Sequence, residues 1–167
     1  DEGRYVLHFD NGDYVYDAVM TPTTPMWRPD TGIWNFGDLE YGWFVAAPTA
    51  DVEATLTMKG VTKRLKGTGY HDHNWGYTGL ENMMNHWYWG RAKVGDYTVI
   101  ACDIIAEKKY GNKRLPVFMI AKDGEILNDD ASITKVERSD THINDFTKKF
   151  MDDTLVYYQD VSPDESM

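Results

Sequence analysis

Runs in which hydrophobic and polar residues alternate, separated by turn-forming dipeptides, occur along most of the chain. Residues 51–58 show the pattern most clearly, because every second side chain is apolar, as in a strand with one solvent-facing side. Asn11-Gly12 and Asp123-Gly124 each separate two such runs, and Gly95-Asp96 has a similar setting. Asn-Gly and Asp-Gly tolerate the positive φ angles of a tight type I′ turn. The pattern therefore predicts a succession of β-hairpins.

Further strand-like runs are rich in aromatic and β-branched residues and cover residues 5–9, 14–19, 86–92, 97–105, 116–120 and 125–127. Residues 21–38 contain three prolines, too many for a central strand, so we expect this segment to cross or cover part of the domain. Residues 144–151 are the best helical candidate, although they are short enough to form a loop. About ten short strands predict an all-β fold, an antiparallel barrel or sandwich. We expect it to span residues 1–161 and to be followed by a frayed tail at 162–167.

The composition narrows the class of partner. The chain has 167 residues, 42% hydrophobic and 14% aromatic, which is enough for one domain with a core and an aromatic ligand-lining surface. A net charge of −10 argues against nucleic acids and anionic membrane surfaces, since both attract clustered Lys and Arg. No apolar run approaches the ~20 residues of a transmembrane helix. We therefore expect a neutral, apolar small molecule as the partner.

The cysteine count and the first residue bear on the compartment. Cys102 is the only cysteine, so no intramolecular disulfide can form, which fits a reducing compartment. We expect a cytoplasmic protein. The start at Asp1 in place of Met leaves room for a removed leader or upstream segment.

Residues 67–77 interrupt the strand pattern with a run of glycines and polar, ionisable side chains. Breaks in local pattern tend to fall at functional sites. Side chains of an extended strand alternate between its two faces, so His71 and His73 are expected on one face. The other face is expected to carry Tyr70, Asp72 and Asn74.

Three interpretations of this segment remain open. In the first, a His and an Asp act as general acid and base on a carbon skeleton inside a dry cavity. In the second, His71 and His73 hold a metal ion together with a third ligand such as His86 or Asp103. In the third, the polar side chains only satisfy buried backbone groups.

Two tryptophans share one face of the next strand. Trp87 and Trp89 alternate with Tyr88, so the indoles are expected either to line an apolar pocket, where their rings stabilise a cation, or to belong to the core. Arg91 follows them and is expected to pair with a carboxylate, Asp72 or Asp103 being the natural partners.

Asp103 lies in an otherwise apolar strand, 99–105. A carboxylate there must be paired or hydrogen-bonded, or its desolvation favours the protonated form. Asp103 is therefore either a proton donor or the structural partner of Arg91. Cys102 beside it is expected to be a small buried hydrophobic residue.

The motif at residues 67–76, followed by Trp87-Tyr88-Trp89-Gly90-Arg91, resembles the hydroxyneurosporene synthase (carotenoid 1,2-hydratase) family. This family includes AttH-like proteins and fungal decalin-forming Diels–Alderases, and the similar stretch runs from Trp34 to Leu127. The resemblance implies two lipocalin-like β domains, a ligand site in or between them, and chemistry on polyene or polyketide-like molecules. By position, His73 and Trp75 match residues implicated in the hydratases, and Asp103 matches the proposed proton donor. One related fungal enzyme class is described as zinc-dependent.

Two departures from the family pattern limit what can be carried over. The hydratases carry a Tyr two residues before the acidic position, where this chain has Ala101. Family members are also roughly twice as long, so most of the partner β domain has no counterpart here. Self-association, or pairing with a missing second β domain, is the corresponding expectation.

The resulting hypothesis is cofactor-free hydration, isomerisation or cyclisation of an apolar molecule in a β-barrel pocket. The residues expected to carry the chemistry are Asp103, His73, Asp72 and Tyr70. Those expected to contact the substrate are Trp75, Trp87, Trp89, Asn74, Tyr88 and Arg91. The alternatives are a non-catalytic carrier of a hydrophobic ligand, and a zinc-dependent lyase with His71, His73 and His86 as ligands.

Overall fold

The computed structural model describes residues 3–146, 148 and 150–159, and within them the fold is built from eleven antiparallel strands and no α-helix. The strands are β1 (Tyr5–Asp10), β2 (Tyr14–Pro22), β3 (Ile33–Phe36), β4 (Leu39–Met58), β5 (Val61–Gly76), β6 (Met84–Val94), β7 (Tyr97–Ala106), β8 (Arg114–Lys122), β9 (Glu125–Asn128), β10 (Lys135–Ile143) and β11 (Phe150–Tyr158). Three short 3₁₀ turns connect some of them: η1 (Leu80–Asn82), η2 (Lys108–Tyr110) and η3 (Ala131–Ile133). The all-β prediction is confirmed. The described part contains no helix of the length and hydropathy that a bilayer crossing requires.

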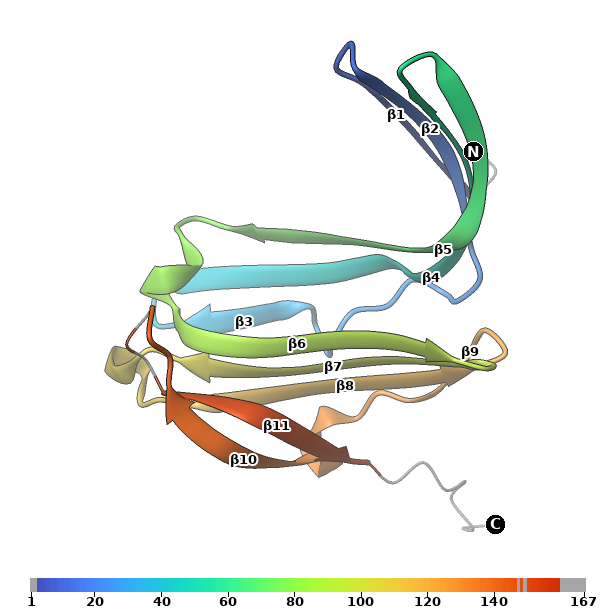
Figure 1. Ribbon diagram of the computed structural model, residues 1–167. Coiled ribbons are helices and arrows are strands. Elements are labelled where there is room, and N and C mark those ends of the chain that lie inside the picture. Colours follow the sequence, from blue (N-terminus) through green and yellow to red (C-terminus); the bar gives the residue numbers. More distant parts are fainter. Residues whose placement is uncertain (1–2, 147, 149, 160–167) are drawn as a thin grey trace, which may run out of the picture.

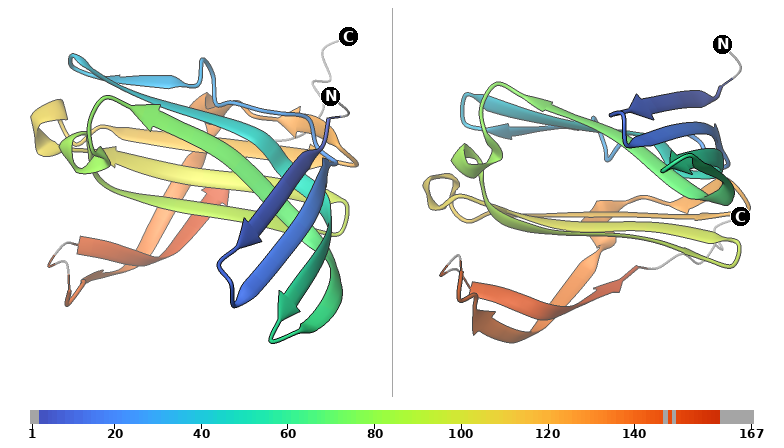
Figure 2. Two further views of the ribbon diagram at one scale, coloured as in Figure 1. Left: turned by 90° about the horizontal axis from the view of Figure 1, so that it is seen from above. Right: turned by 45° about the horizontal axis from the view of Figure 1, so that its top comes forward.

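Two larger sheets lie face to face. The first has the order β1-β2-β4-β3, with β5 on the other side of β4, and the second has the order β6-β7-β8-β9. The hairpin β10–β11 forms a third, two-stranded sheet on the far side of the second sheet (Figures 1 and 2). Within the described residues the two larger sheets do not join, so the domain is an open sandwich and not a closed barrel.

The first sheet is sharply bent. β4 is 20 residues long, and its pairing with β5 shifts register between Val45 and Ala47 and again between Ala47 and Ala50. Such irregularities bend a strand. Beyond the bend, β1, β2 and the adjoining parts of β4 and β5 form a four-stranded sheet that extends away from the sandwich (Figure 1). We call residues 5–20 and 52–67 the projecting region.

The core fills the space between the two sheets. It consists of apolar side chains that alternate along β4, β7 and β8, with others from the segments that connect strands. The largest are Trp27, Phe36, Tyr41, Trp43, Val45, Met83, Met84, Ile100, Ile104, Val117 and Met119. The proline-rich segment runs along the edge of the first sheet, where Trp27 bridges to Val45 and β3 pairs with β4. It therefore covers part of the core, as predicted.

The turn predictions had mixed outcomes. Asp123 and Gly124 have φ angles of 51° and 84°, as a type I′ turn requires. Asn11 does not have a positive φ, and its Oδ1 accepts hydrogen bonds from the backbone N–H groups of Asp13 and Tyr14 in a longer loop. The type I′ turn predicted there is wrong, because the side chain replaces a backbone acceptor.

The C-terminal predictions fall partly outside the described residues. Residues 145–146 form a turn and β11 begins at Phe150, so the helical alternative for 144–151 is wrong. The tail expected at 162–167 lies outside the described residues.

Candidate functional site

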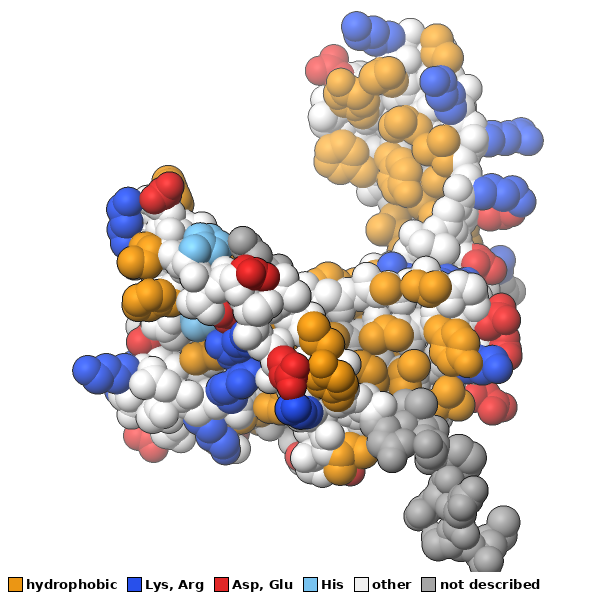
Figure 3. Space-filling view, turned by 60° about the horizontal axis from the view of Figure 1, so that its bottom comes forward, with side chains coloured by type: hydrophobic (Ala, Val, Ile, Leu, Met, Phe, Trp, Pro, Cys, Tyr) orange, Lys and Arg blue, Asp and Glu red, His pale blue; other side chains and the backbone are white. Residues whose placement is uncertain are grey.

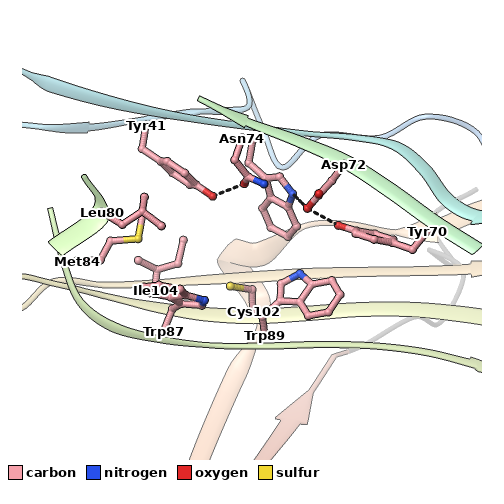
Figure 4. Close-up of a pocket in the computed structure, with 11 residues that line it drawn as sticks. Tyr41, Tyr70, Asp72, Asn74, Leu80, Met84, Trp87, Trp89, Cys102 and Ile104 are labelled. Carbon is pink, nitrogen blue, oxygen red and sulfur yellow. Dashed lines mark hydrogen bonds between the residues drawn. The ribbon is translucent and has the colours of Figure 1, made fainter. Parts of the chain in front are cut away.

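A cavity of about 430 Å³ lies between the two larger sheets (Figure 4). Small-molecule pockets commonly measure about 300–1,000 Å³. The first sheet and the second sheet contribute its two walls, and its lining residues are Tyr41, Trp43, Tyr70, Asp72, Asn74, Leu80, Met84, Trp87, Trp89, Cys102 and Ile104. The lining is mostly aromatic and aliphatic, with polar groups gathered on the wall formed by β4 and β5.

Strand alternation explains which side chains enter the cavity. On β5, Tyr70, Asp72 and Asn74 point toward the second sheet (Figure 4). On β6, Trp87 and Trp89 point back from the opposite wall. The sequence prediction that these two groups of residues lie on common faces is confirmed by this geometry.

Asp72 is the polar centre of the cavity. Its Oδ2 accepts a hydrogen bond from Trp43 Nε1 at 2.9 Å and another from the Tyr70 hydroxyl at 2.8 Å. Nearby, the Tyr41 hydroxyl donates to Asn74 Oδ1. Two donors on this one oxygen fix the direction of the carboxylate.

Burial keeps the phenols of the cavity protonated. It raises the pKa of Tyr70 far above its usual range, and the hydrogen bond to Asp72 acts in the same direction. Burial also raises the pKa of Tyr41, with smaller contributions from Cys102 and Asp72. Both hydroxyls are therefore hydrogen-bond donors at neutral pH, and neither acts as a phenolate base.

The two tryptophans form the more open wall. Trp87 and Trp89 are 49% and 45% exposed, so each ring reaches from the cavity to solvent. Trp89 meets the ring of Tyr70 edge-on, with centroids 5.3 Å apart. The two indoles therefore lie where the cavity opens to solvent.

Arg91 does not pair with a carboxylate, contrary to the sequence prediction. Its Nε donates to the Pro48 carbonyl at 2.8 Å, and its Nη2 donates to Thr49 Oγ1 and the Gly69 carbonyl, both at 3.2 Å. The guanidinium lies 5.7 Å from the ring centre of Tyr70. The bends of β4 and β5 expose backbone carbonyls here, and a five-donor guanidinium satisfies them. Arg91 thus ties β6 to the bend and supports the cavity from outside its lining.

His71, His73 and Trp75 lie on the face of the first sheet that points away from the cavity. His73 stacks on Trp75 with ring centroids 5.6 Å apart, and His71 meets the ring of Tyr5 edge-on at 4.9 Å. Trp75 lies flat over Gly42, where a Cβ would come within 2.0 Å of the indole. The structure therefore separates His73 and Trp75 from the cavity residues with which the sequence had grouped them.

The histidines suggested as metal ligands are not brought together. His86 contacts Tyr88 on the outer side of the second sheet, whereas His71 and His73 lie on the outer side of the first. In the described part of the chain, no group of three or more His, Cys, Asp or Glu side chains has a metal-binding arrangement.

Asp103 also lies outside the cavity. Cys102 and Ile104 face the cavity, so Asp103 points to the other side of the second sheet, toward β10–β11. It is completely buried, and its Oδ2 accepts from Arg114 Nη2 at 2.5 Å and Arg138 Nη2 at 2.8 Å. Its structural partners are these two arginines. The sequence had suggested Arg91 instead.

The same buried cluster fixes the hairpin to the sheet. Arg138 of β10 also reaches Asp152 Oδ2 at 3.4 Å, and the Tyr88 hydroxyl donates to that oxygen at 3.0 Å. Thr141 donates to the other oxygen of Asp152 at 2.5 Å. Tyr88, expected to contact substrate, therefore holds the hairpin on the far face of the sheet.

Six lining residues were not predicted as site residues: Tyr41, Trp43, Leu80, Met84, Cys102 and Ile104. A signal was present for the first two, because apolar and small or polar residues alternate from Leu39 to Trp43. Leu80 and Met84 lie around a short 3₁₀ turn that carries no periodic pattern. Their inward direction depends on tertiary packing.

Comparison with known proteins identifies the family to which the chain belongs. The family model for the carotenoid hydratase CrtC matches residues 35–155. The chain belongs to the carotenoid hydratase CrtC family. This match confirms the resemblance seen at residues 67–76 and 87–91 and extends it to β10 and β11.

Relatives of this CrtC-family chain are enzymes by name. The quinolone epoxide rearrangement protein penF of Penicillium thymicola is 32% identical over 83 residues, which are 50% of this chain and 22% of that protein. The acyclic carotenoid 1,2-hydratase of Rhodobacter capsulatus is 32% identical over 104 residues, 61% of this chain and 35% of that protein. The relatives thus point to hydration or rearrangement as the reaction classes of the family.

Two solved structures share the fold. Kievitone hydratase from Nectria haematococca superposes with a TM-score of 0.62 at 16% identity, covering 93% of this chain and 48% of that one. An AttH-type protein from Nitrosomonas europaea gives a TM-score of 0.61, also at 16% identity, covering 90% and 48%. The chain therefore spans about half the length of the structures that it resembles.

Proposed function

We propose that the cavity binds an apolar, unsaturated small molecule and promotes its hydration or rearrangement by acid/base chemistry without a cofactor. The observation that carries the proposal is a single carboxylate, Asp72, held by two donors in a cavity lined mainly by aromatic and aliphatic groups. Membership of the CrtC family, with relatives named for hydration and for epoxide rearrangement, supports the same reaction classes.

Asp72 is the group that moves the proton. In a hydration, its protonated form gives the proton to an alkene carbon, water attacks the resulting cation, and the carboxylate takes up the proton that this water releases. In a rearrangement, it gives a proton to one atom of the substrate and recovers one from a neighbouring carbon. Both sequences return the carboxyl group to its starting form, so the hydration consumes only substrate and one water, and the rearrangement consumes only substrate.

The surrounding side chains orient the reactants. Trp43 and Tyr70 hold the carboxyl group in one direction. Asn74 uses Oδ1 to accept from Tyr41, which leaves its amide N–H groups as donors to a water or a substrate oxygen. The ring faces of Trp87 and Trp89 stabilise cationic character in the substrate. Closing water out of the cavity strengthens each of these electrostatic effects.

Binding and chemistry are tested separately. Binding is measured with cis-parinaric acid, an apolar polyene whose emission is excited by energy transfer from nearby tryptophans; we expect Trp89→Ala to weaken it. Chemistry is followed by mass spectrometry with acyclic terpenoid polyenes in ¹⁸O-labelled water. Hydration adds one labelled water, whereas rearrangement changes the retention time without changing the mass.

The decisive variant is Asp72→Asn, with Asp51→Asn, an exposed carboxylate of the same sheet, as the matched control. We expect Asp72→Asn to lower turnover by about 10²–10⁴-fold, the usual effect of losing a general acid or base, with binding retained. Unchanged turnover in this variant would contradict the proposal. Retained binding without conversion of any polyene would identify the protein as a carrier.

A further inference from the structure

The projecting region has one apolar face and one polar face. Strand pairing aligns its residues in rows across the four strands: Tyr5, Met20, Val52 and Gly67; Leu7, Ala18, Ala54 and Leu65; Phe9, Tyr16, Leu56 and Lys63; and Tyr14, Met58 and Val61. These rows share one face, because side chains of a strand alternate. Among these residues, all described by the structure, Lys63 alone is charged.

The opposite face of the same strands has the character of a solvent-exposed surface. It carries two ion pairs, His8 Nδ1 with Asp17 Oδ1 at 2.6 Å and Lys66 Nζ with Glu53 Oε1 at 2.7 Å. An antiparallel sheet with one polar face normally packs its apolar face against another layer. Here no other layer formed by the described residues covers the apolar face.

Exposure of this apolar face is large. Phe9 is 56% exposed, Val61 61%, Leu65 43% and Leu7 41%. Figure 3 shows hydrophobic side chains gathered over the projecting part of the molecule, with Lys and Arg along its outer side. Where the sheet bends, the ring of Tyr5 meets His71, so the apolar face continues onto the outer face of the sandwich that carries Trp75.

The dimensions of this face suit a protein partner. Four strands spaced about 4.8 Å apart, with about seven residues at 3.3 Å each, give a flat area of roughly 400 Å². The accessible area is larger, because side chains stand out from the sheet. Soluble monomers rarely expose contiguous apolar patches of more than a few hundred Å², and a standard interface buries about 800 Å² on each partner. The flat area of the face is therefore about half of what one partner buries in a standard interface, and the protruding side chains add to it.

We propose that a second copy of this chain covers the apolar face, with the two projecting regions packed face to face about a two-fold axis. Two sheets pack in this way about 10 Å apart. The central row has small residues, Ala18 and Ala54, between Leu7 and Leu65, so each sheet has a shallow middle that large side chains of the other can enter. In the dimer, the projecting region of the second copy supplies the layer that covers this face.

Charge favours this face over any other for self-association. Each copy carries a net charge of −10, so two copies repel through most of their surfaces. The apolar face is nearly uncharged and brings no acidic groups together. An interface of this kind is not weakened by salt, because salt screens the overall repulsion while leaving the burial of apolar surface in place.

The test is the molar mass in solution, measured by sedimentation velocity and by light scattering after size exclusion, at low and high salt. We expect a dimer of the full chain that high salt does not dissociate. Leu7→Lys and Leu65→Glu place charges on the apolar face and should each yield monomer. Val6→Lys is the matched control, because Val6 neighbours Leu7 but lies 79% exposed on the opposite face, and it should remain dimeric.

Circular dichroism and thermal melting show whether each variant is folded before its mass is interpreted. A wild-type monomer at high micromolar concentration would overturn the proposal and leave the face for a different partner. Dimers that survive both Leu7→Lys and Leu65→Glu, or that dissociate in high salt, would also overturn it. If one variant fails to fold, the other still tests the same face.

Discussion

Asp103→Asn separates a structural role of this residue from a catalytic one. The carboxylate is fully buried and bonded through one oxygen to Arg114 and Arg138. Removing one member of a buried ion pair costs about 3–5 kcal/mol, because the remaining charge loses its partner. Arg114 is 44% exposed and is re-solvated by water, and Arg138 keeps Asp152, so we reduce this figure to about 2–3 kcal/mol. At roughly 2–4 °C per kcal/mol, the melting temperature should fall by about 4–12 °C.

The assay is urea unfolding followed by tryptophan fluorescence, with thermal melting by circular dichroism as a second measurement. Glu53→Gln is the control, because Glu53 also forms an ion pair on a strand but is exposed to solvent; it should leave the unfolding midpoint unchanged. Folded Asp103→Asn should bind cis-parinaric acid like the wild type, since Asp103 lies on the other side of the sheet from the cavity. Wild-type stability combined with lost binding or turnover would refute this reasoning and restore Asp103 as the proton donor.

Three further predictions concern Gly42, Cys102 and Asp152. Gly42→Ala should displace the indole of Trp75 and destabilise the fold by about 1–3 kcal/mol in urea unfolding, whereas Gly90→Ala, whose added Cβ meets no atom within 4 Å, should not. Burial, with a smaller contribution from Asp103, raises the pKa of Cys102 to about 12, so Ellman's reagent at pH 8 should react with the unfolded chain only. The pKa of Asp152 is held below its ordinary value of 3.8 by hydroxyl hydrogen bonds and Arg138, which outweigh the opposing effect of burial. Its stabilising contribution is therefore present above pH 3.8 and lost as the pH falls through the lower folded value, which hydrogen exchange of β10–β11 should detect.

Each of these predictions has a clear contrary result. Equal stability of the two alanine variants would mean that Trp75 does not rely on Gly42. Rapid reaction of the folded thiol would mean that Cys102 is accessible. Acid-induced exchange in β10–β11 that persists unchanged in Asp152→Asn would assign the pH dependence to another group.

Local alternation in the sequence correctly predicted which side chains share a face of a strand. It did not predict which of the two faces packs against the second sheet. It placed Tyr70, Asp72 and Asn74 on one side of β5 and the histidines on the other, and the structure agrees. The alternation of side chains along a strand does not reveal which of its two faces packs against the second sheet. The histidine face suggested chemistry by residue type, yet the cavity lies on the side of Asp72.

Asp103 shows a second limit of the same kind. Both faces of β7 are apolar, because one packs on the first sheet and the other lies under β10–β11. Alternation therefore gave no direction for the carboxylate, and of its two arginine partners Arg114 lies on the neighbouring strand β8 while Arg138 comes from β10, 35 residues along the chain. No strand was predicted at residues 135–143, and residues 144–151 were expected to form a short helix or a loop, so the strand pair that covers Asp103 was not foreseen.

Neighbouring residues of β7 point to opposite faces of the second sheet, one toward the cavity and one toward the buried arginine cluster. A shift in the register of β7 by one residue would therefore be damaging. Sliding β7 by one position between β6 and β8 would turn the Cys102 thiol toward two arginines and bring a negative charge among the indoles. The arginine cluster and the cavity would be damaged at once, one by an uncompensated pair of cations and the other by an unsolvated anion. We therefore expect insertions and deletions to be tolerated less well in the tight loop at residues 95–96 than at residues 23–32, where the chain contacts the first sheet at isolated points.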